Sequence, residues 1–260
     1  MQVLQKVALI LDRLAEEGEV SAARLAELVD EPRSTVYRLL RSMQELDYVT
    51  PGSRKGTYQL GLALLRLGSS VMARFDERQA ALPVMECVHA ATEETVFLCT
   101  RRGNEAVCIE RIDGLLVQSM ALRLGGSLPL HVGAASRALL AAEPREFWGT
   151  YLSREGGLAA WTEHTPTTKE ALFAALEEVR ETGVAISDED VVLGMAAVGA
   201  TVRNHRGDVC AAVSMSGPRP TILGDRTAES LQVIASAAAE ISTALGYAAL
   251  HGLTDGKATE

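Results

Sequence analysis

The sequence predicts an α+β fold in two parts, a small helical N-terminal part and a larger C-terminal domain with an antiparallel sheet. Apolar residues recur at helical spacing through the first 46 residues, and a turn rich in Pro and Gly at 51–56 then separates two short strand-like segments. Beyond residue 94, strand-like segments come in pairs around tight turns, with helical segments on either side. We expect a first domain at 1–60, a linker helix at 61–78, a second domain at 79–252 and a tail at 253–260.

The segment 30–46, DEPRSTVYRLLRSMQEL, predicts an amphipathic helix. Pro32 suits the first turn, with Asp30 or Glu31 as the cap, because proline has no N–H to lose there. The apolar face is expected to hold Val36, Leu39, Leu40, Met43 and Leu46. The opposite face carries Ser34, Arg38 and Arg41 with Tyr37 at its flank, a set of groups suited to phosphates and base edges.

Two shorter helices precede this segment. The first is expected from Val3 to Glu16, where Gly18 ends it, and its inward positions are Val3, Val7, Ile10 and Leu14. Ser21 caps the second, whose inward residues are Leu25, Leu28 and Val29. A short break then leads into the third helix, which is the helix-turn-helix pattern.

A hairpin follows the third helix. Tyr48 and Val49 form a short strand, the segment 51–56 turns, and residues 57–60 return, so that Arg54 and Lys55 lie at the tip. A hairpin in this position makes residues 1–60 a winged helix-turn-helix domain, whose tip can reach a DNA backbone or minor groove. The alternatives are a solvated helix face and a plain surface hairpin. We expect DNA contacts from Arg33, Ser34, Thr35, Tyr37, Arg38, Arg41, Arg54 and Lys55.

The charge distribution supports this interpretation. The formal net charge is −9, but residues 1–78 hold 11 basic and 11 acidic groups, so the whole excess falls on residues 79–260. Within 33–66 there are six basic groups against two acidic ones. Positive charge is therefore concentrated around the third helix and the hairpin.

A helix over residues 60–78 is expected to carry an apolar stripe of Leu60, Leu64, Leu67, Val71 and Phe75. Such a stripe has to be buried, against the first helix or a second subunit. A dimer would place two third helices about one DNA turn apart and would bind a palindromic operator.

The second domain is expected to contain a helix at 78–92, strands TVFLCTRR and AVCIERID, and a further strand LVQSMALRL. SLPLHVGAASRALLAA starts extended and becomes helical at about Gly133, and helices follow at 144–152 and 168–182, the latter ended by Gly183. VAISDEDVVLG, MAAVGATVRN and DVCAAVSMSG are expected strands, and a final helix is expected from Asp225 to about Leu250.

Two features of this domain suit a bound small molecule. The helix start in SLPLHVGAAS offers small residues and free backbone N–H groups, which favour a carboxylate. Ser214 and Ser216 are two apart on one strand, so both hydroxyls point to the same side and need partners if buried. A ligand or backbone carbonyls could supply those partners.

These residues resemble the IclR family of bacterial transcriptional regulators from about Val3 to Leu250. The segments that carry the resemblance are STVYRLL, TYQLGLALLRLG, SLPLHVGAASRALLA and DEDVVLGMAAVGATVRNHRGDVCAAVSMSGP. The resemblance implies a winged helix, a linker helix and a GAF-like C-terminal domain that binds a small organic acid or related metabolite. It also implies dimers, often paired into tetramers.

The effector positions implied by the family fall on Met120, Leu128, Ala134, Ala135, Ser187, Met195, Ala197, Ser214 and Ser216. Two departures indicate a less polar pocket, since Ser187 stands where the family often has an acid and Ala197 where some members have Cys. Ser136–Arg137 replaces a common Gly-Lys pair. We expect His131 to hold the adjacent loop, although it could also hydrogen-bond a ligand.

Other classes of function have weaker support. An enzyme could be imagined from Cys99, Cys108, His89 and His131, but no nucleophile elbow, P-loop or dinucleotide fingerprint appears. The run Asp188 to Asp190 could bind a metal but is more typical of a solvated turn, and the four cysteines lack metal-ligand spacing. We expect no cofactor and no catalytic residues.

The sequence also predicts a cytoplasmic protein without a membrane segment. Arg13, Arg66 and Arg74 interrupt the longest apolar stretches, and the N-terminus lacks the cleavage site of a signal peptide. A purely structural DNA-binding protein is the third alternative. The size of the second domain argues against it, because DNA binding alone does not need so large a core.

Overall fold

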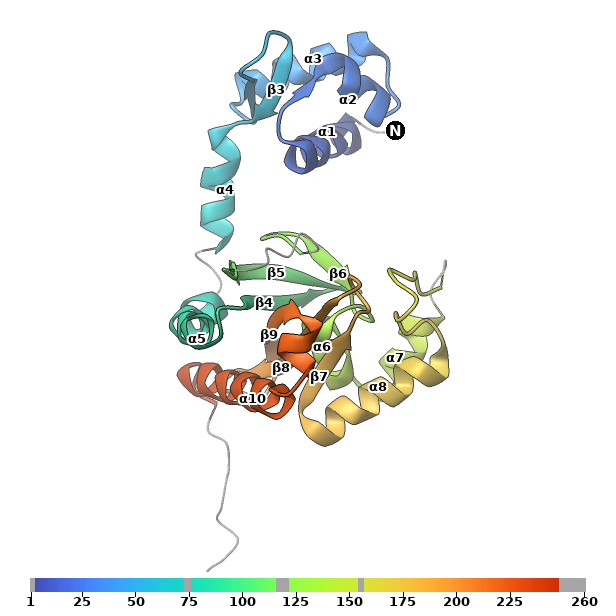
Figure 1. The fold of residues 1–260 in the computed structure, drawn as a ribbon. Helices are drawn as coiled ribbons and strands as arrows, with labels where there is room; N and C mark the ends of the chain where they lie inside the picture. The colour runs from blue at the N-terminus through green and yellow to red at the C-terminus, as the bar shows by residue number, and fades with distance from the viewer. Residues whose placement is uncertain (1–2, 73–75, 116–121, 154–156, 248–260) are drawn as a thin grey trace, which may run out of the picture. The chain divides into compact units, whose positions relative to one another are not determined.

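The computed structural model describes residues 3–72, 76–115, 122–153 and 157–247. The chain divides into two compact units, Met1–Arg74 and Phe75–Glu260, and each is considered by itself below (Figure 1). The predicted α+β class is confirmed, with a helical N-terminal unit and a C-terminal unit built on one antiparallel sheet.

The N-terminal unit is a winged helix, as the sequence predicted (Figure 1). Its strands form a small antiparallel sheet in the order β1-β3-β2. The elements are α1 (Val3–Glu17), β1 (Val20–Ser21), α2 (Ala22–Leu28), α3 (Arg33–Glu45), β2 (Val49–Pro51), β3 (Thr57–Leu60) and α4 (Leu62–Met72). The Ser21 hydroxyl accepts from the Arg24 N–H, which is the expected cap of α2.

One hydrophobic core holds the three helices and the wing together. The fully buried side chains include Ile10, Leu14, Leu25, Val36 and Leu40. Two expected core positions are wrong. Val3 is exposed because it is the first residue of α1, and Leu46 is 59% exposed because α3 ends at Glu45 and leaves Leu46 as its C-cap.

The start of α3 also differs from the prediction. Pro32 is itself the N-cap residue, and neither Asp30 nor Glu31 caps the helix. The Glu31 carboxylate instead forms an ion pair with Lys6 Nζ of α1 at 2.7 Å. A salt bridge from the turn before α3 to α1 is therefore found in place of the expected local cap.

The helix expected over 60–78 is shorter. Leu60 belongs to strand β3, α4 covers Leu62–Met72, and a separate helix α5 begins at Asp76. Phe75 lies outside the described residues. Of the expected stripe, Leu60 and Leu67 are exposed and Leu64 is half-buried, while Leu62 and Leu65, which lie outside the stripe, are exposed as well. The described leucines of the stripe are therefore not fully buried within the N-terminal unit.

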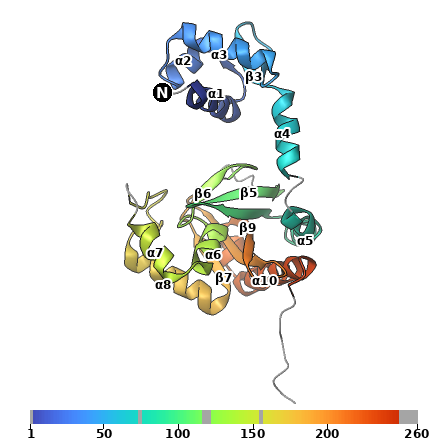
Figure 2. The ribbon, with the colours of Figure 1, turned by 180° about the vertical axis from the view of Figure 1, so that it is seen from behind.

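The C-terminal unit is a six-stranded antiparallel sheet in the order β6-β5-β4-β9-β8-β7, with helices on both faces (Figure 2). Its strands are β4 (Thr95–Arg102), β5 (Glu105–Ile112), β6 (Ser127–Pro129), β7 (Val184–Asp188), β8 (Met195–Arg203) and β9 (Val209–Pro218). Its helices are α5 (Asp76–Thr92), α6 (Ala134–Ala142), α7 (Arg145–Leu152), α8 (Lys169–Thr182), α9 (Arg219–Leu223) and α10 (Thr227–Ala244).

Each face of the sheet has its own core. On one face α5 and α10 lie side by side and pack on residues such as Leu98, Val198 and Val213 (Figures 1 and 2). On the other face, α6, α7 and α8 pack on alternate residues, including Phe97 and Ala212. The period-2 alternation of side chains along the strands thus divides apolar residues between two helical layers.

Some predicted elements in this unit differ in extent. The strand expected over 184–194 ends at Asp188, because Glu189 takes a positive φ of 57° and its Oε1 accepts from the Gly194 N–H at 2.6 Å, closing a loop. The final helix spans only Thr227–Ala244 and ends before Gly246, whose φ is 82°. The expected strand LVQSMALRL lies largely outside the described residues, and Leu122 to Leu124 are not in a strand.

Candidate functional site

The outward face of α3 presents the groups that the sequence singled out. Arg33, Ser34, Tyr37, Arg38 and Arg41 are exposed, and Thr35 is half-buried near the start of the helix. Arg41 Nε lies 3.7 Å from Glu45 Oε1, and both side chains are exposed. Separating this ion pair therefore costs little free energy. The face therefore offers guanidinium and hydroxyl groups to a partner outside this domain.

The tip of the wing is organised by Glu19, a residue with no predicted role in the sequence. Its carboxylate accepts from Ser53 Oγ at 2.8 Å, from the Arg54 N–H at 3.0 Å and from Thr57 Oγ1. These hydrogen bonds, chiefly that from Thr57, lower the pKa of Glu19 to about 2. The two predicted cations of the wing, Arg54 and Lys55, are exposed on this turn.

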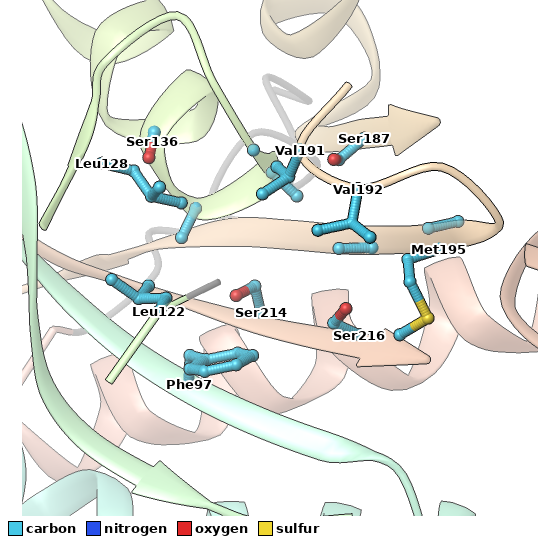
Figure 3. A pocket seen from close by; sticks show the side chains of 15 residues that line it. Phe97, Leu122, Leu128, Ser136, Ser187, Val191, Val192, Met195, Ser214 and Ser216 are labelled. Carbon is cyan, nitrogen blue, oxygen red and sulfur yellow. The ribbon is translucent and has the colours of Figure 1, made fainter. Parts of the chain in front are cut away.

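In the C-terminal unit, a cavity opens between the sheet, the start of α6 and the loop 189–194 (Figure 3). Its lining is mostly apolar with a few polar groups, as is usual for small-molecule sites. Eight of the predicted effector positions line it: Leu128, Ala134, Ala135, Ser187, Met195, Ala197, Ser214 and Ser216. The ninth, Met120, lies outside the described residues.

Seven further residues that line the cavity were not predicted from the sequence. They are Phe97, Leu122, Gly133, Ser136, Val191, Val192 and Ala196. Phe97 joins the site because it pairs with Ser214 across β4 and β9. Val191 and Val192 join it because the loop 189–194 replaces the end of the expected strand. Phe97 therefore lines the cavity because of strand register, and the two valines line it because of the loop closure. Neither feature can be predicted from the local spacing of apolar residues.

The floor of the cavity consists of two rows of residues across the sheet. One row runs Ser187, Ala197, Ser216 through β7, β8 and β9, and the next row places Gly199 beside Ser214. The two serine hydroxyls therefore lie on the same face, as expected, and both point into the cavity (Figure 3). Small residues in β8 leave space above the sheet.

The start of α6 approaches this floor closely. A Cβ at Gly199 would lie 3.0 Å from Ala135 N and 3.1 Å from Ser214 Cβ, so only glycine fits there without a shift. Gly133 is the N-cap with a φ of 85°, a conformation that favours glycine, and no side chain caps the helix. The first-turn N–H groups of Ala134, Ala135 and Ser136 therefore have no intrahelical partners.

A buried ion pair lies behind the cavity wall. Asp190 Oδ2 accepts from Arg137 Nη1 and from the Gly133 N–H at 3.0 Å, and Oδ1 accepts from Ser187 Oγ. Arg137 also donates to the carbonyl oxygens of Ile186 and His131. The prediction of a solvated acidic turn is therefore wrong for Asp190, which is buried, while Asp188 pairs with Arg219 at the surface.

His131 is a structural residue. Its Nε2 lies 3.0 Å from the Ala159 carbonyl and its Nδ1 lies 2.8 Å from Tyr151 Oη. A carbonyl can only accept, so Nε2 carries the proton and the tyrosine hydroxyl donates to Nδ1. His131 thus ties the loop before α6 to α7 and does not line the cavity, as expected.

The residues of the enzyme alternative do not form a catalytic site. Cys99 and Cys108 face one another across β4 and β5 and are buried, and the pKa of Cys99 is raised by its hydrogen bond with Cys108 and by burial. His89 Nδ1 lies instead against the Glu94 carbonyl at 3.0 Å. Within the described ranges no cluster of three or more His, Cys, Asp or Glu side chains suits a metal ion.

A winged helix with a basic outer face, joined to a domain with a mostly apolar cavity, is typical of a ligand-responsive DNA-binding protein. Sequence profiles agree, because residues 3–52 match the IclR helix-turn-helix domain and residues 69–243 match the bacterial transcriptional regulator IclR C-terminal domain. The chain belongs to the IclR family of bacterial transcriptional regulators.

Individual relatives support the assignment. The chain is 32% identical over 249 residues to the HTH-type transcriptional repressor AllR of Escherichia coli K12, covering 95% of this chain and 92% of AllR. The crystal structure of Thermotoga maritima IclR matches with a TM-score of 0.78 and 31% identity over 94% of this chain and 98% of that one. An IclR homolog from Microbacterium hydrocarbonoxydans complexed with 4-hydroxybenzoate matches with a TM-score of 0.77 and 26% identity, covering 92% and 98%.

These relatives are transcriptional regulators, which supports a regulator and not an enzyme. In the part of the chain that the structure describes, no helix is both long enough and apolar enough to cross a membrane.

Proposed function

We propose that this IclR-type regulator binds a palindromic operator as a homodimer or a pair of dimers, and that a small organic acid in the C-terminal cavity alters its operator affinity. The observation that carries the proposal is the uncapped start of α6, which faces an apolar cavity beside the Ser214 hydroxyl. Helix N-termini favour anions, because free N–H groups and the helix dipole both point toward the ligand.

DNA contact is proposed for the exposed face of α3 and for the wing. Arg38 and Arg41 are long enough to reach base edges when the helix enters a major groove, with Arg33, Ser34, Thr35 and Tyr37 around them. Arg54 and Lys55 would then contact the backbone near the wing. The exposed leucines of α4 support an oligomer, because a second subunit would bury them.

The relatives suggest the direction of regulation and a chemical class of effector. AllR is named a repressor and the Microbacterium homolog binds 4-hydroxybenzoate, so repression relieved by an organic acid is the mode we propose here. The effector-binding residues proposed are the eight cavity residues expected from the sequence, with Phe97, Leu122 and Val192 added. Such a protein would act in the cytoplasm, where bacterial DNA lies.

Selection of genomic fragments by the purified full-length protein tests the proposal. Bound fragments are expected to share a palindrome whose half-sites lie about one DNA turn apart, ~34–36 Å. Sedimentation of the protein with and without such a fragment should give an even number of subunits. Failure to enrich any fragment at low salt, in the presence and absence of organic acids, would contradict the proposal.

A further inference from the structure

Two cysteines lie opposite one another in the interior of the C-terminal sheet. Cys99 of β4 is the Cα partner of Cys108 of β5, and the two residues are 0% and 1% exposed. Both side chains belong to the same hydrophobic core, on the face of the sheet that α6, α7 and α8 cover. All four cysteines of the chain are free thiols, so Cys99 and Cys108 are available to each other.

The pairing geometry of these two residues suits a disulfide. The Cys108 N–H donates to the Gly126 carbonyl at 2.9 Å, and the Cys108 carbonyl accepts from the Gly125 N–H at 2.8 Å. Both backbone groups of Cys108 therefore point away from β4, which makes Cys99 and Cys108 a non-hydrogen-bonded pair. The Cα atoms of such a pair lie about 4.5 Å apart, within the range of about 4.4–6.8 Å that a disulfide requires.

The two thiols also interact with one another. The pKa of the Cys99 thiol is raised above its ordinary value by a hydrogen bond with Cys108 and by burial. Cys108 Sγ in turn donates to the Glu110 carbonyl at 3.2 Å. The donors therefore run from Cys99 through Cys108 to the backbone, and the two sulfur atoms are in contact.

Opening of the sheet edge would expose Cys108 before Cys99. The outer side of β5 is covered by β6, a strand of three residues at the end of the sheet, whereas β4 lies between β5 and β9. Ser127 Oγ of β6 donates to Glu105 Oε2 of β5 at 3.0 Å, at the surface. Short edge strands open at low free-energy cost. Because buried thiols react slowly, this opening sets the rate at which a reagent reaches Cys108.

We propose that Cys99 and Cys108 form a redox site, which a hydroperoxide oxidises to a cross-strand disulfide. The Cys108 sulfur attacks the O–O bond and takes one oxygen as a sulfenic acid, while the other oxygen leaves with the thiol proton as an alcohol. Cys99 Sγ then displaces the hydroxyl from Cys108, so that the S–S bond forms and the hydroxyl leaves with the Cys99 proton as water. Two thiols and one hydroperoxide thus give one disulfide, one alcohol and one water. A small thiol reverses the oxidation by exchange.

The disulfide would lie next to the wall of the cavity. Phe97 precedes Cys99 by two residues on the same face of β4, and it lines the cavity. Leu128, which also lines the cavity, pairs with Ala106, two residues before Cys108. Bond formation draws the two sulfurs to about 2.05 Å, and a close-packed core transmits such a shift to its neighbours. Oxidation should therefore alter the cavity wall and, through it, operator affinity; this last step alone rests on the proposed function.

Peptide mapping of the full-length protein tests the redox site directly. The protein is treated with tert-butyl hydroperoxide, its remaining thiols are blocked, and a tryptic digest is analysed by mass spectrometry without reduction. Trypsin cleaves after Arg101 and Arg102, so Cys99 and Cys108 fall in separate peptides. The expected product is this pair of peptides joined with two hydrogens fewer, and dithiothreitol should separate them.

The same map in the Cys87→Ser, Cys210→Ser double variant assigns the linkage, because Cys87 shares the tryptic peptide 79–101 with Cys99. Cys87 is exposed and Cys210 is half-buried, so accessibility alone would favour oxidation at those two positions. Free thiols at both Cys99 and Cys108 after exposure of the double variant to the hydroperoxide overturn the proposal. A disulfide that forms in the double variant as in the parent supports it.

The entry route is tested by the rate of disulfide formation. Ser127→Ala removes the hydrogen bond from β6 to Glu105, so it should speed the reaction by about twofold or more. Ser153→Ala, an exposed serine at the C-cap of α7, is the matched control and should react at the rate of the parent. Equal rates for Ser127→Ala and the parent overturn entry through the opened edge.

Operator binding before and after oxidation tests the consequence. The double variant should change its affinity for a selected operator fragment by about fivefold or more, and dithiothreitol should restore the first value. The same protein with Cys108→Ala should show no change. If Cys108→Ala unfolds, as its melting curve would show, Cys99→Ala takes its place. Unchanged operator affinity in a fully oxidised protein overturns the link to the cavity. A reduced protein that binds no operator contradicts the proposed function, whereas the peptide map still decides the redox site.

Discussion

Arg137 on α6 and Asp190 on the loop after β7 form an ion pair in the interior of the C-terminal unit, where they are 4% and 2% exposed. Asp190 accepts from Ser187 and from the backbone of Gly133, both of which line the cavity. Thr165 Oγ1 donates to the Asp190 carbonyl at 2.8 Å. The pair therefore fixes the loop 189–194 to the start of α6 and sets the shape of the cavity between them.

Replacing Asp190 by Asn should destabilise the C-terminal unit strongly. The substitution leaves the buried Arg137 charge without a counter-ion, which typically costs about 3–5 kcal/mol. Urea unfolding followed by the fluorescence of Trp148, which is buried against α6 through its bond to the Leu140 carbonyl at 2.7 Å, would measure the loss.

Asp188→Asn is the matched control, because it removes a neighbouring carboxylate whose pair with Arg219 is at the surface. Its expected cost is about 0–1 kcal/mol. Similar losses for the two variants would mean that Asp190 is not held in a buried pair.

The Glu19 carboxylate should control the order of the wing tip as a function of pH. Its folded pKa of about 2 lies below the ordinary value of 4.5, so its contribution to stability is present above pH 4.5 and is lost as the pH falls toward about 2. The amide proton of Arg54, which donates to Glu19, should report this titration in an NMR spectrum. A midpoint near 4.5 would show that the hydrogen bonds to Glu19 are absent in solution.

The titration of Glu94 should change the stability of the fold with pH in the opposite direction to that of Glu19. Burial raises its pKa above the ordinary value of 4.5, although Arg226 acts against the shift, while Glu93 adds to it. The folded state therefore holds this proton more tightly than the unfolded state. The associated stability is present below pH 4.5 and is lost as the pH rises through the folded pKa.

Glu94→Gln removes that titration, so the variant should gain stability relative to the parent as the pH rises above 4.5. Melting temperatures of both proteins across this range provide the measurement. Glu86→Gln is the control, because it removes an exposed carboxylate of α5 that is not among the causes of the Glu94 shift. A constant difference between Glu94→Gln and the parent at every pH would contradict a raised pKa.

Local periodicity was sufficient to predict much of the fold. The apolar spacing of Val36, Leu39, Leu40 and Met43 places the exposed face of α3 correctly, since a helix repeats every 3.6 residues. Where an element ends was harder to predict. Leu46 continues the pattern but lies past the last turn, and the strand from Val184 breaks at Glu189, whose backbone conformation no local pattern indicates.

Interactions between distant segments were not predictable in the same way. Arg137 and Asp190 are 53 residues apart, and Glu19 and Ser53 are 34 apart, so only the folded chain reveals that they meet. Ser214 and Ser216 could be assigned to one side because they share a strand. Phe97 could not be added to them, since its position beside Ser214 depends on the pairing register of β4 with β9.

Two cations of the N-terminal unit should affect DNA binding differently. Arg38 is exposed in the middle of α3, where a base contact would be specific, so Arg38→Ala should lower operator affinity by about 1–3 kcal/mol and leave binding to random DNA nearly unchanged. Lys55→Ala, at the wing tip, should weaken binding to both DNAs alike and reduce the slope of log affinity against log salt by about one. Titrations of both variants at several salt concentrations, with operator and scrambled duplexes, separate the two effects. Equal losses on both duplexes for Arg38→Ala would assign that side chain to a phosphate, and specificity would then have to come from Arg41, Ser34 or the shape of the DNA.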